Sequence, residues 1–145
     1  MQDNIIKLHD GRNLGYAEYG KPGGIPLLLF HGTPGSRVFK QFENASWIEE
    51  SGMRVITPER PGYGLSDPAP GRTIKDWAND VIELADYLEI DRFHVARGSG
   101  GGPCIYVAWH RGYFDAGVVG AQVFQTDTRM RNSLYTKRRA SASRK

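Results

Sequence analysis

The chain has 145 residues, of which 39% are hydrophobic and 24% charged, with a formal net charge of +3 and one cysteine. This length predicts a single domain, the lone Cys104 excludes an internal disulfide, and no apolar run approaches the roughly 20 residues of a membrane-spanning helix. The N-terminus lacks the basic and then apolar pattern of a secretory signal, and no side chains have metal-ligand spacing. We therefore expect a cytoplasmic domain without metal or cofactor.

The first 32 residues predict three strands. Segments 4–8 and 13–20 place apolar residues between turn signals, as paired antiparallel strands do. Residues 25–32, IPLLLFHG, form a continuous apolar run of strand length. Such a run indicates a strand buried on both faces in a parallel sheet.

Two helices and another strand are expected next. Residues 38–51 carry three aromatic side chains and suit a helix, and residues 53–64 predict a short strand that ends in a Pro/Gly loop. A second helix is expected to open at Thr73, because Thr73 and Asp76 have the spacing of a capping box. Its apolar stripe consists of Trp77, Val81, Leu84 and Leu88.

Residues 95–104, VARGSGGGPC, surround one serine with glycines after a predicted strand at 92–96. A helix is expected to follow from residue 103, and residues 116–124 predict a last strand. Alternating strands and helices favour an α/β domain with a mostly parallel sheet. The glycine run would expose Ser99 at a sharp strand-to-helix turn, although a tight connection without chemistry has the same composition.

The last eighteen residues differ from the rest in charge. All sixteen acidic residues lie at or before Asp127, whereas seven of the nineteen basic residues lie in 128–145. This composition predicts a disordered basic tail after a domain at 1–127. A basic tail can bind nucleic acid, but Tyr135 is its only base-stacking aromatic residue, so we do not expect a nucleic-acid partner.

Three motifs, in order, resemble those of the α/β-hydrolase-fold family. They are LLFHGTPGSR at 28–37, VITPERPGYGLSDP at 55–68 and HVARGSGGGP at 94–103, and the resemblance covers residues 1 to about 120. It implies the N-terminal half of that fold. The expected structure is an incomplete α/β-hydrolase fold, with a mostly parallel sheet of about six strands and flanking helices.

The resemblance also implies roles for five residues. Ser99 would attack an ester or amide carbonyl of a small-molecule substrate and form an acyl-serine. The backbone N–H groups of Gly100 and Thr33 would stabilise the oxyanion, and His31 and Gly32 would support the loop that carries Thr33. In this family the histidine of the supporting loop is not the catalytic base.

Arg97 departs from the family pattern, which has a small residue two positions before the nucleophile. Its guanidinium must either extend into solvent or distort the turn that carries Ser99. The family's catalytic base is a histidine that follows the last strand. His110 is the only histidine after Ser99, and the helical rise places it roughly 15 Å away, beyond hydrogen-bond reach.

The other candidates for an acid and a base are weak. His9 and His94 lie in early strand positions, where a structural role is the ordinary interpretation. Asp127 follows the last predicted strand and suits the alternative acid position that some family members use. The acid of such a site acts by orienting the catalytic histidine, and no histidine is in reach of Ser99, so base and acid stay unassigned.

A non-catalytic product is therefore the alternative to a serine hydrolase. The change to a basic Ser/Arg-rich sequence near residue 128 suggests a truncated or frameshifted chain, or a pseudoenzyme that binds without turnover. A sheet that ends at 116–124 would expose an unpaired edge. We expect such an edge to cause self-association through residues 117–124.

Overall fold

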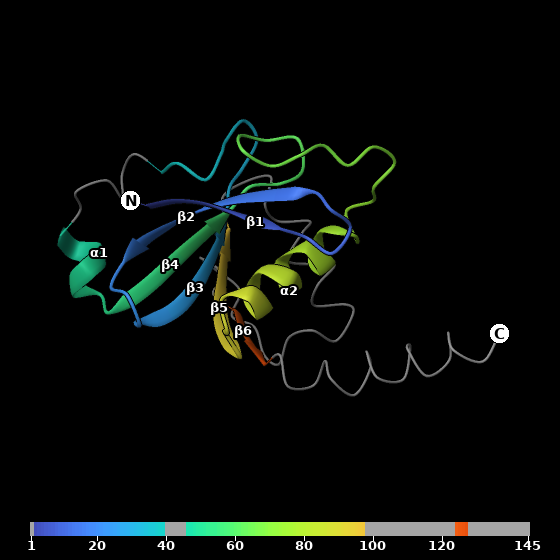
Figure 1. Cartoon of the computed structure of the whole chain (residues 1–145). Coiled ribbons are helices and arrows are strands. Elements are labelled where there is room, and N and C mark those ends of the chain that lie inside the picture. Colours follow the sequence, from blue (N-terminus) through green and yellow to red (C-terminus); the bar gives the residue numbers. More distant parts are fainter. Residues whose placement is uncertain (1, 40–45, 98–123, 128–145) are drawn as a thin grey trace, which may run out of the picture.

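The computed structural model describes residues 2–39, 46–97 and 124–127. Within these ranges the chain forms six strands and two helices (Figure 1). In chain order they are β1 (Gln2–Lys7), β2 (Asn13–Gly20), β3 (Ile25–Phe30), α1 (Ser46–Glu50), β4 (Met53–Pro58), α2 (Trp77–Tyr87), β5 (Arg92–Arg97) and β6 (Phe124–Asp127).

The strands form one sheet in the order β1-β2-β4-β3-β5-β6. The central strand β3 pairs in parallel with both β4 and β5. The pairs β1–β2, β2–β4 and β5–β6 are antiparallel, so four of the six described strands run in one direction. The predicted α/β fold with about six strands and flanking helices is confirmed. The carboxyl ends of β3, β4 and β5 meet at one edge of the sheet.

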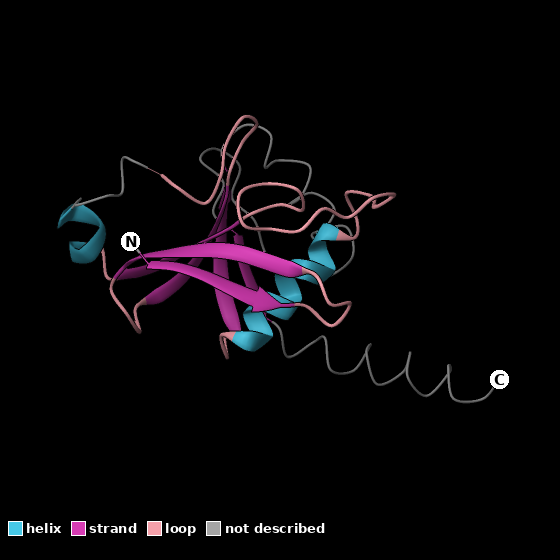
Figure 2. Cartoon of the chain, turned by 45° about the horizontal axis from the view of Figure 1, so that its top comes forward, coloured by secondary structure: helices cyan, strands magenta, loops and turns pink. Residues whose placement is uncertain are grey.

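Alternating side chains of β3 pack into two hydrophobic clusters on opposite faces of the sheet. Leu28 and Phe30 of β3 lie in a cluster with α2, whereas Leu27 and Leu29 pack against a second cluster that contains Ile48 of α1. Figure 2 shows α2 along one face of the sheet, with α1 away from it. The prediction that β3 is covered on both faces is confirmed, because successive strand residues point to opposite faces.

The apolar stripe of α2 is confirmed. Trp77, Val81 and Leu84 are buried, and Leu88 packs against their cluster from the helix end. The Trp77 ring meets Phe30 edge-on, with ring centroids 6.1 Å apart. Burial of this stripe, rather than helix propensity alone, is what holds α2 on the sheet.

The start of α2 was predicted four residues too early. Asp76 Oδ2 accepts hydrogen bonds from the Thr73 N–H at 2.7 Å and from the Thr73 hydroxyl at 2.9 Å. The expected contact between these two residues is therefore present. The Asp76 N–H, however, bonds to the Thr73 carbonyl at 3.1 Å. This closes a separate turn, after which the helix begins at Trp77.

The predicted helix at 38–51 is wrong at its start, because the described helix spans only Ser46–Glu50. Phe39 is not helical, and its N–H donates to the Tyr19 hydroxyl at 3.0 Å. This bond ties the segment to β2 and draws it away from helical geometry. The intervening residues 40–45 lie outside the described part of the chain.

Several predictions fall outside the described residues. These are the helix from residue 103, most of the strand at 116–124 and the tail at 128–145. The sixth described strand is β6, and its antiparallel register places Asp127 opposite Arg92, at the start of β5. This corrects the expectation for Asp127, since an acid near Ser99 would have to lie at the carboxyl end of β5, whereas Asp127 lies at its amino end. Within the described ranges, no helix has the length and apolar character to cross a membrane.

Candidate active site at the carboxyl edge of the sheet

The parallel pairing of β3 and β5 brings two of the sequence motifs together. In this register Phe30, the last residue of β3, lies opposite Arg97, the last residue of β5. The loop with His31, Gly32 and Thr33 therefore leaves the sheet beside the point where the chain leaves β5 (Figure 1). Ser99 and Gly100 follow β5 in the sequence and lie outside the described residues.

His31 is buried, with 2% of its surface exposed, and both of its ring nitrogens have backbone partners. Nδ1 lies 2.8 Å from the Gly32 carbonyl oxygen, which can only accept, so Nδ1 carries the proton. Nε2 then accepts the Arg60 N–H at 3.4 Å. Burial, together with the positive charge of Arg60, lowers the pKa of His31 and keeps the ring neutral.

Arg60 connects the loop after β4 to the loop after β3. Its Nη2 donates to the Gly32 carbonyl at 2.9 Å and to the Thr33 hydroxyl at 2.5 Å. The guanidinium carbon lies 4.8 Å from the centre of the Tyr63 ring, which itself lies 5.2 Å from the His31 ring. A cation held over an aromatic face in this way is attracted by the ring.

Glu59, which precedes Arg60, has a carboxylate with no exposed surface. Its Oε1 accepts the Arg37 backbone N–H at 3.2 Å and Arg37 Nη1 at 2.9 Å, and its Oε2 accepts the Leu65 N–H at 2.6 Å. Arg37 also pairs with Asp3 of β1, with both nitrogen–oxygen distances at 3.0 Å. The buried carboxylate thereby holds the loop after β3 against the loop after β4.

Sequence reasoning did not single out Glu59 or Arg60. The motif VITPERPGYGLSDP was found, but a loop has no periodicity that shows where each side chain points. Their partners lie far away in the chain, since Arg37 is 22 residues from Glu59 and His31 is 29 residues from Arg60. The adjacent charged pair Glu59 and Arg60, between a buried strand and a Pro/Gly turn, was the available signal.

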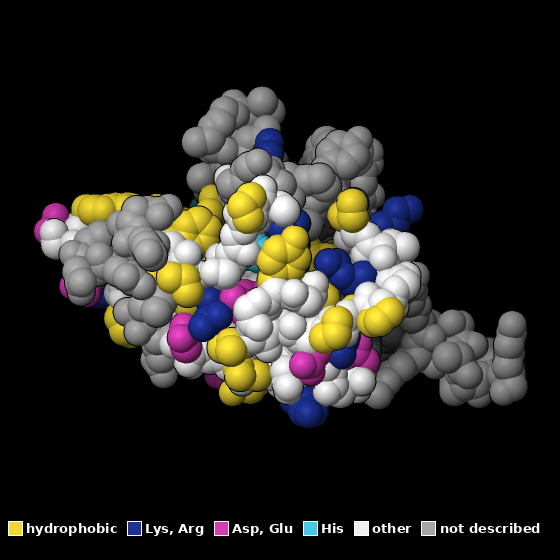
Figure 3. Space-filling model, turned by 90° about the horizontal axis from the view of Figure 1, so that it is seen from above, with side chains coloured by type: hydrophobic (Ala, Val, Ile, Leu, Met, Phe, Trp, Pro, Cys, Tyr) yellow, Lys and Arg dark blue, Asp and Glu magenta, His cyan; other side chains and the backbone are white. Residues whose placement is uncertain are grey.

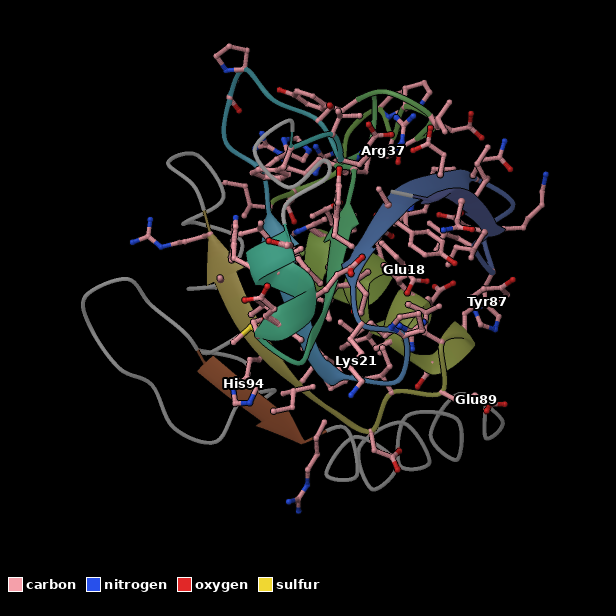
Figure 4. All side chains as sticks on the ribbon, turned by 90° about the vertical axis from the view of Figure 1, so that its left-hand side faces the viewer. Glu18, Lys21, Arg37, Tyr87, Glu89 and His94 are labelled. Atoms are coloured by element: carbon pink, nitrogen blue, oxygen red, sulfur yellow. The ribbon has the colours of Figure 1, made fainter. Side chains whose placement is uncertain are left out.

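The other described histidines are not among the residues that hold the loop after β3. His9 is exposed, and its Nδ1 lies 2.8 Å from Glu83 Oε2. His94 aligns with Leu27, early in β3, and Figure 4 shows it on the side of the sheet away from Arg37. A structural role was the ordinary interpretation of both, and the structure places His94 within β5 and His9 against Glu83 of α2.

Arg97 is exposed at the end of β5. The turn that carries Ser99 lies outside the described residues, and the choice between the two arrangements expected for the guanidinium stays a prediction. Figure 3 looks onto the carboxyl edge, where basic and hydrophobic side chains lie close together. In the described part of the chain, no group of three or more His, Cys, Asp or Glu side chains is arranged to hold a metal ion.

Known proteins share this part of the sequence, although no protein-family model matches it. The chain is 37% identical to an uncharacterised hydrolase, YcgS, of Bacillus subtilis over 94 residues, which are 65% of this chain and 32% of that protein. It is 33% identical to a non-heme chloroperoxidase of Streptomyces lividans over 100 residues, or 67% of this chain and 36% of the relative. The chain spans about a third of the length of these relatives.

A solved structure shares the fold as well. An α/β-hydrolase-fold protein of Burkholderia ambifaria is 27% identical, with a TM-score of 0.59 over 75% of this chain and 39% of that one. The relatives, this structure and the observed sheet order agree on one assignment. The part of the chain that they cover belongs to the α/β-hydrolase-fold family.

Proposed function

We propose that the carboxyl edge of the sheet is the oxyanion side of a serine-hydrolase active site. Ser99 attacks the carbonyl carbon of a small-molecule ester or amide, the C–O or C–N bond to the leaving group breaks, and the alcohol or amine departs with the proton that the Ser99 hydroxyl loses, which gives an acyl-serine. Water then hydrolyses that acyl group. The backbone N–H groups of Thr33 and Gly100 donate to the carbonyl oxygen while it carries negative charge.

The observation that carries this proposal is the register that pairs Phe30 with Arg97. Ligands of open α/β sheets bind outside the carboxyl ends of the strands. Thr33 follows β3 by three residues and Ser99 follows β5 by two, so both belong to segments that leave the sheet at this edge. Neutral, buried His31 fits a role in supporting the Thr33 loop, because both ring nitrogens already have partners.

The names of the relatives support the reaction class. Proteins similar to this chain include proline iminopeptidases, and some similar structures are epoxide hydrolases. The epoxide-hydrolase branch of this family uses an aspartate as its nucleophile, whereas position 99 is a serine. We therefore favour attack on an ester or amide carbonyl over epoxide opening. A protein of the same fold that binds small molecules without turnover is the alternative.

A covalent label on Ser99 tests the proposal. The acyl-serine mechanism predicts that a fluorophosphonate loses fluoride and phosphonylates the serine oxygen, and that peptide mapping by mass spectrometry finds the adduct on the peptide that contains Ser99. Ser99→Ala should remove the adduct, whereas Ser141→Ala in the basic tail should keep it. No adduct on Ser99 in the unaltered chain would contradict the acyl-serine mechanism and favour the non-catalytic alternative.

A second prediction concerns the oxyanion donor. Thr33→Pro removes the backbone N–H at this position and should slow phosphonylation of Ser99 by about 10²–10³-fold, the usual effect of losing one such donor. Thr33→Ala is the matched control, because it keeps the N–H and removes only the hydroxyl. Equal labelling rates in these two variants would show that the Thr33 N–H is not a donor to the reacting group.

A further inference from the structure

We propose that Arg60 is the positioning residue of the oxyanion donor, because its guanidinium holds and polarises the peptide unit that joins Gly32 to Thr33. This inference rests on the proposed function, in which the Thr33 N–H binds the oxyanion. Arg60 does not touch the reacting atoms in this scheme. It acts through the carbonyl group at the other end of the same peptide.

Two side chains donate to this carbonyl. Arg60 Nη2 lies 2.9 Å from the Gly32 oxygen, and the protonated Nδ1 of His31 lies 2.8 Å from it. The peptide between Gly32 and Thr33 is trans, whereas the next one, between Thr33 and Pro34, is cis. In a planar trans peptide the C=O and N–H point in opposite directions. Fixing the Gly32 oxygen therefore aims the Thr33 N–H away from Arg60 and His31.

The charge of Arg60 also makes the Thr33 N–H a stronger hydrogen-bond donor. Hydrogen bonds from an ionised donor are roughly twice as strong as neutral ones. A donor that draws electron density toward the Gly32 oxygen makes the Thr33 N–H of the same amide a better donor, because hydrogen bonds in a chain polarise one another. By polarising the Gly32–Thr33 amide, Arg60 thus increases the partial positive charge that the Thr33 N–H presents to the proposed oxyanion site.

The surroundings of Arg60 keep the guanidinium in place. Its contacts with the Thr33 hydroxyl and with the Tyr63 ring fix its position on two sides. Glu59, the preceding residue, anchors the backbone through the bonds from Arg37 and Leu65. A guanidinium stays charged across the physiological range, and Nη2 alone carries two N–H groups, one for the Gly32 carbonyl and one for the Thr33 hydroxyl.

Nuclear magnetic resonance of the ¹⁵N-labelled full chain tests the inference without requiring activity. In Arg60→Gln we expect the Thr33 amide proton to move upfield and its hydrogen exchange to quicken. Arg60→Lys should give an intermediate shift, since it restores the charge but not the planar group that lies over the Tyr63 ring. Arg54→Gln is the matched control, because Arg54 pairs with Glu18 on the β2–β4 strands, and it should leave Thr33 unchanged. A Thr33 amide that keeps its shift and exchange rate in Arg60→Gln would overturn the inference.

Labelling of Ser99 then separates the inference from the proposed function. We expect Arg60→Gln to slow phosphonylation by about tenfold, less than the loss of the whole donor in Thr33→Pro. A labelled Ser99 whose rate is the same in Arg60→Gln would overturn the role of Arg60 while the proposed function stands. An unlabelled Ser99 in the unaltered chain would overturn the proposed function, and the Thr33 amide shift would still decide what Arg60 does. Should Arg60→Gln not fold, Arg60→Lys carries both readouts.

Discussion

Gly64→Ala should lower the free energy of unfolding by about 4–6 kcal/mol, because its new methyl group would overlap the buried carboxylate of Glu59. Gly64 has a φ of +51°, where a side chain adds about 1 kcal/mol of strain. Glu59 has no exposed surface into which to move, and Arg37 and Leu65 hold its oxygens. Displacing it breaks a buried ion pair, which typically costs about 3–5 kcal/mol.

Gly62→Ala is the matched control for this prediction. Gly62 also has a positive φ, +81°, but a methyl group there would meet nothing within 4 Å. Only the backbone strain of about 1 kcal/mol should remain. Urea unfolding followed by tryptophan fluorescence measures both variants. Equal losses at Gly62 and Gly64 would mean that Glu59 adjusts without cost, and the described role of its carboxylate would be wrong.

Arg12→Met should destabilise the chain by about 3–5 kcal/mol at neutral pH, because it leaves the Asp80 carboxylate buried without its charge partner. Arg12 donates to both oxygens of Asp80, at 3.1 and 2.7 Å, and Asp80 is only 5% exposed. The pair joins the β1–β2 turn to α2. We expect an unchanged sheet with a lower midpoint of unfolding.

The pH dependence of this variant follows from the pKa of Asp80. Burial raises that pKa even in the presence of Arg12, and removal of Arg12 leaves the burial unopposed. The folded variant then binds a proton more readily than the unfolded chain does, so its stability increases as the pH falls through the raised pKa. The difference in the free energy of unfolding between Arg12→Met and the unaltered chain should therefore be smaller in acid than at neutral pH.

Combining Arg12→Met with Asp80→Asn provides the control. The amide carries no charge, so the double variant should be less destabilised at neutral pH and should lack the recovery in acid. A deficit in Arg12→Met that stays constant from pH 7 to the acid range would show that lost packing of the arginine stem, rather than an unpaired carboxylate, causes the effect.

Strands and the α2 stripe could be predicted from the sequence because their side-chain period is set by burial. Residues 13–20 form a strand with the predicted bounds, since turn signals flank a run that is buried along most of its length. Helix bounds were less predictable. Thr73 and Phe39 each take part in a local or long-range hydrogen bond that competes with helix formation, and apolar spacing does not show such bonds.

The candidate site was predictable only in part. The His31–Thr33 loop could be named from its motif, and the parallel sheet explains why it leaves beside β5. Glu59 and Arg60 were missed because their roles arise from contacts between loops that are distant in the sequence. The assignment of Ser99, Gly100 and Thr33 to acyl transfer stays a prediction.

The most direct test asks whether Ser99 and the Thr33 N–H meet at one reacting group. In the ¹⁵N-labelled chain, phosphonylation of Ser99 would place a tetrahedral, oxygen-bearing centre where the oxyanion forms. The Thr33 amide proton should then move downfield, while the amide of Glu18 in the distant β2 strand should keep its position. An adduct confirmed on Ser99 that leaves the Thr33 resonance unmoved would contradict the shared site.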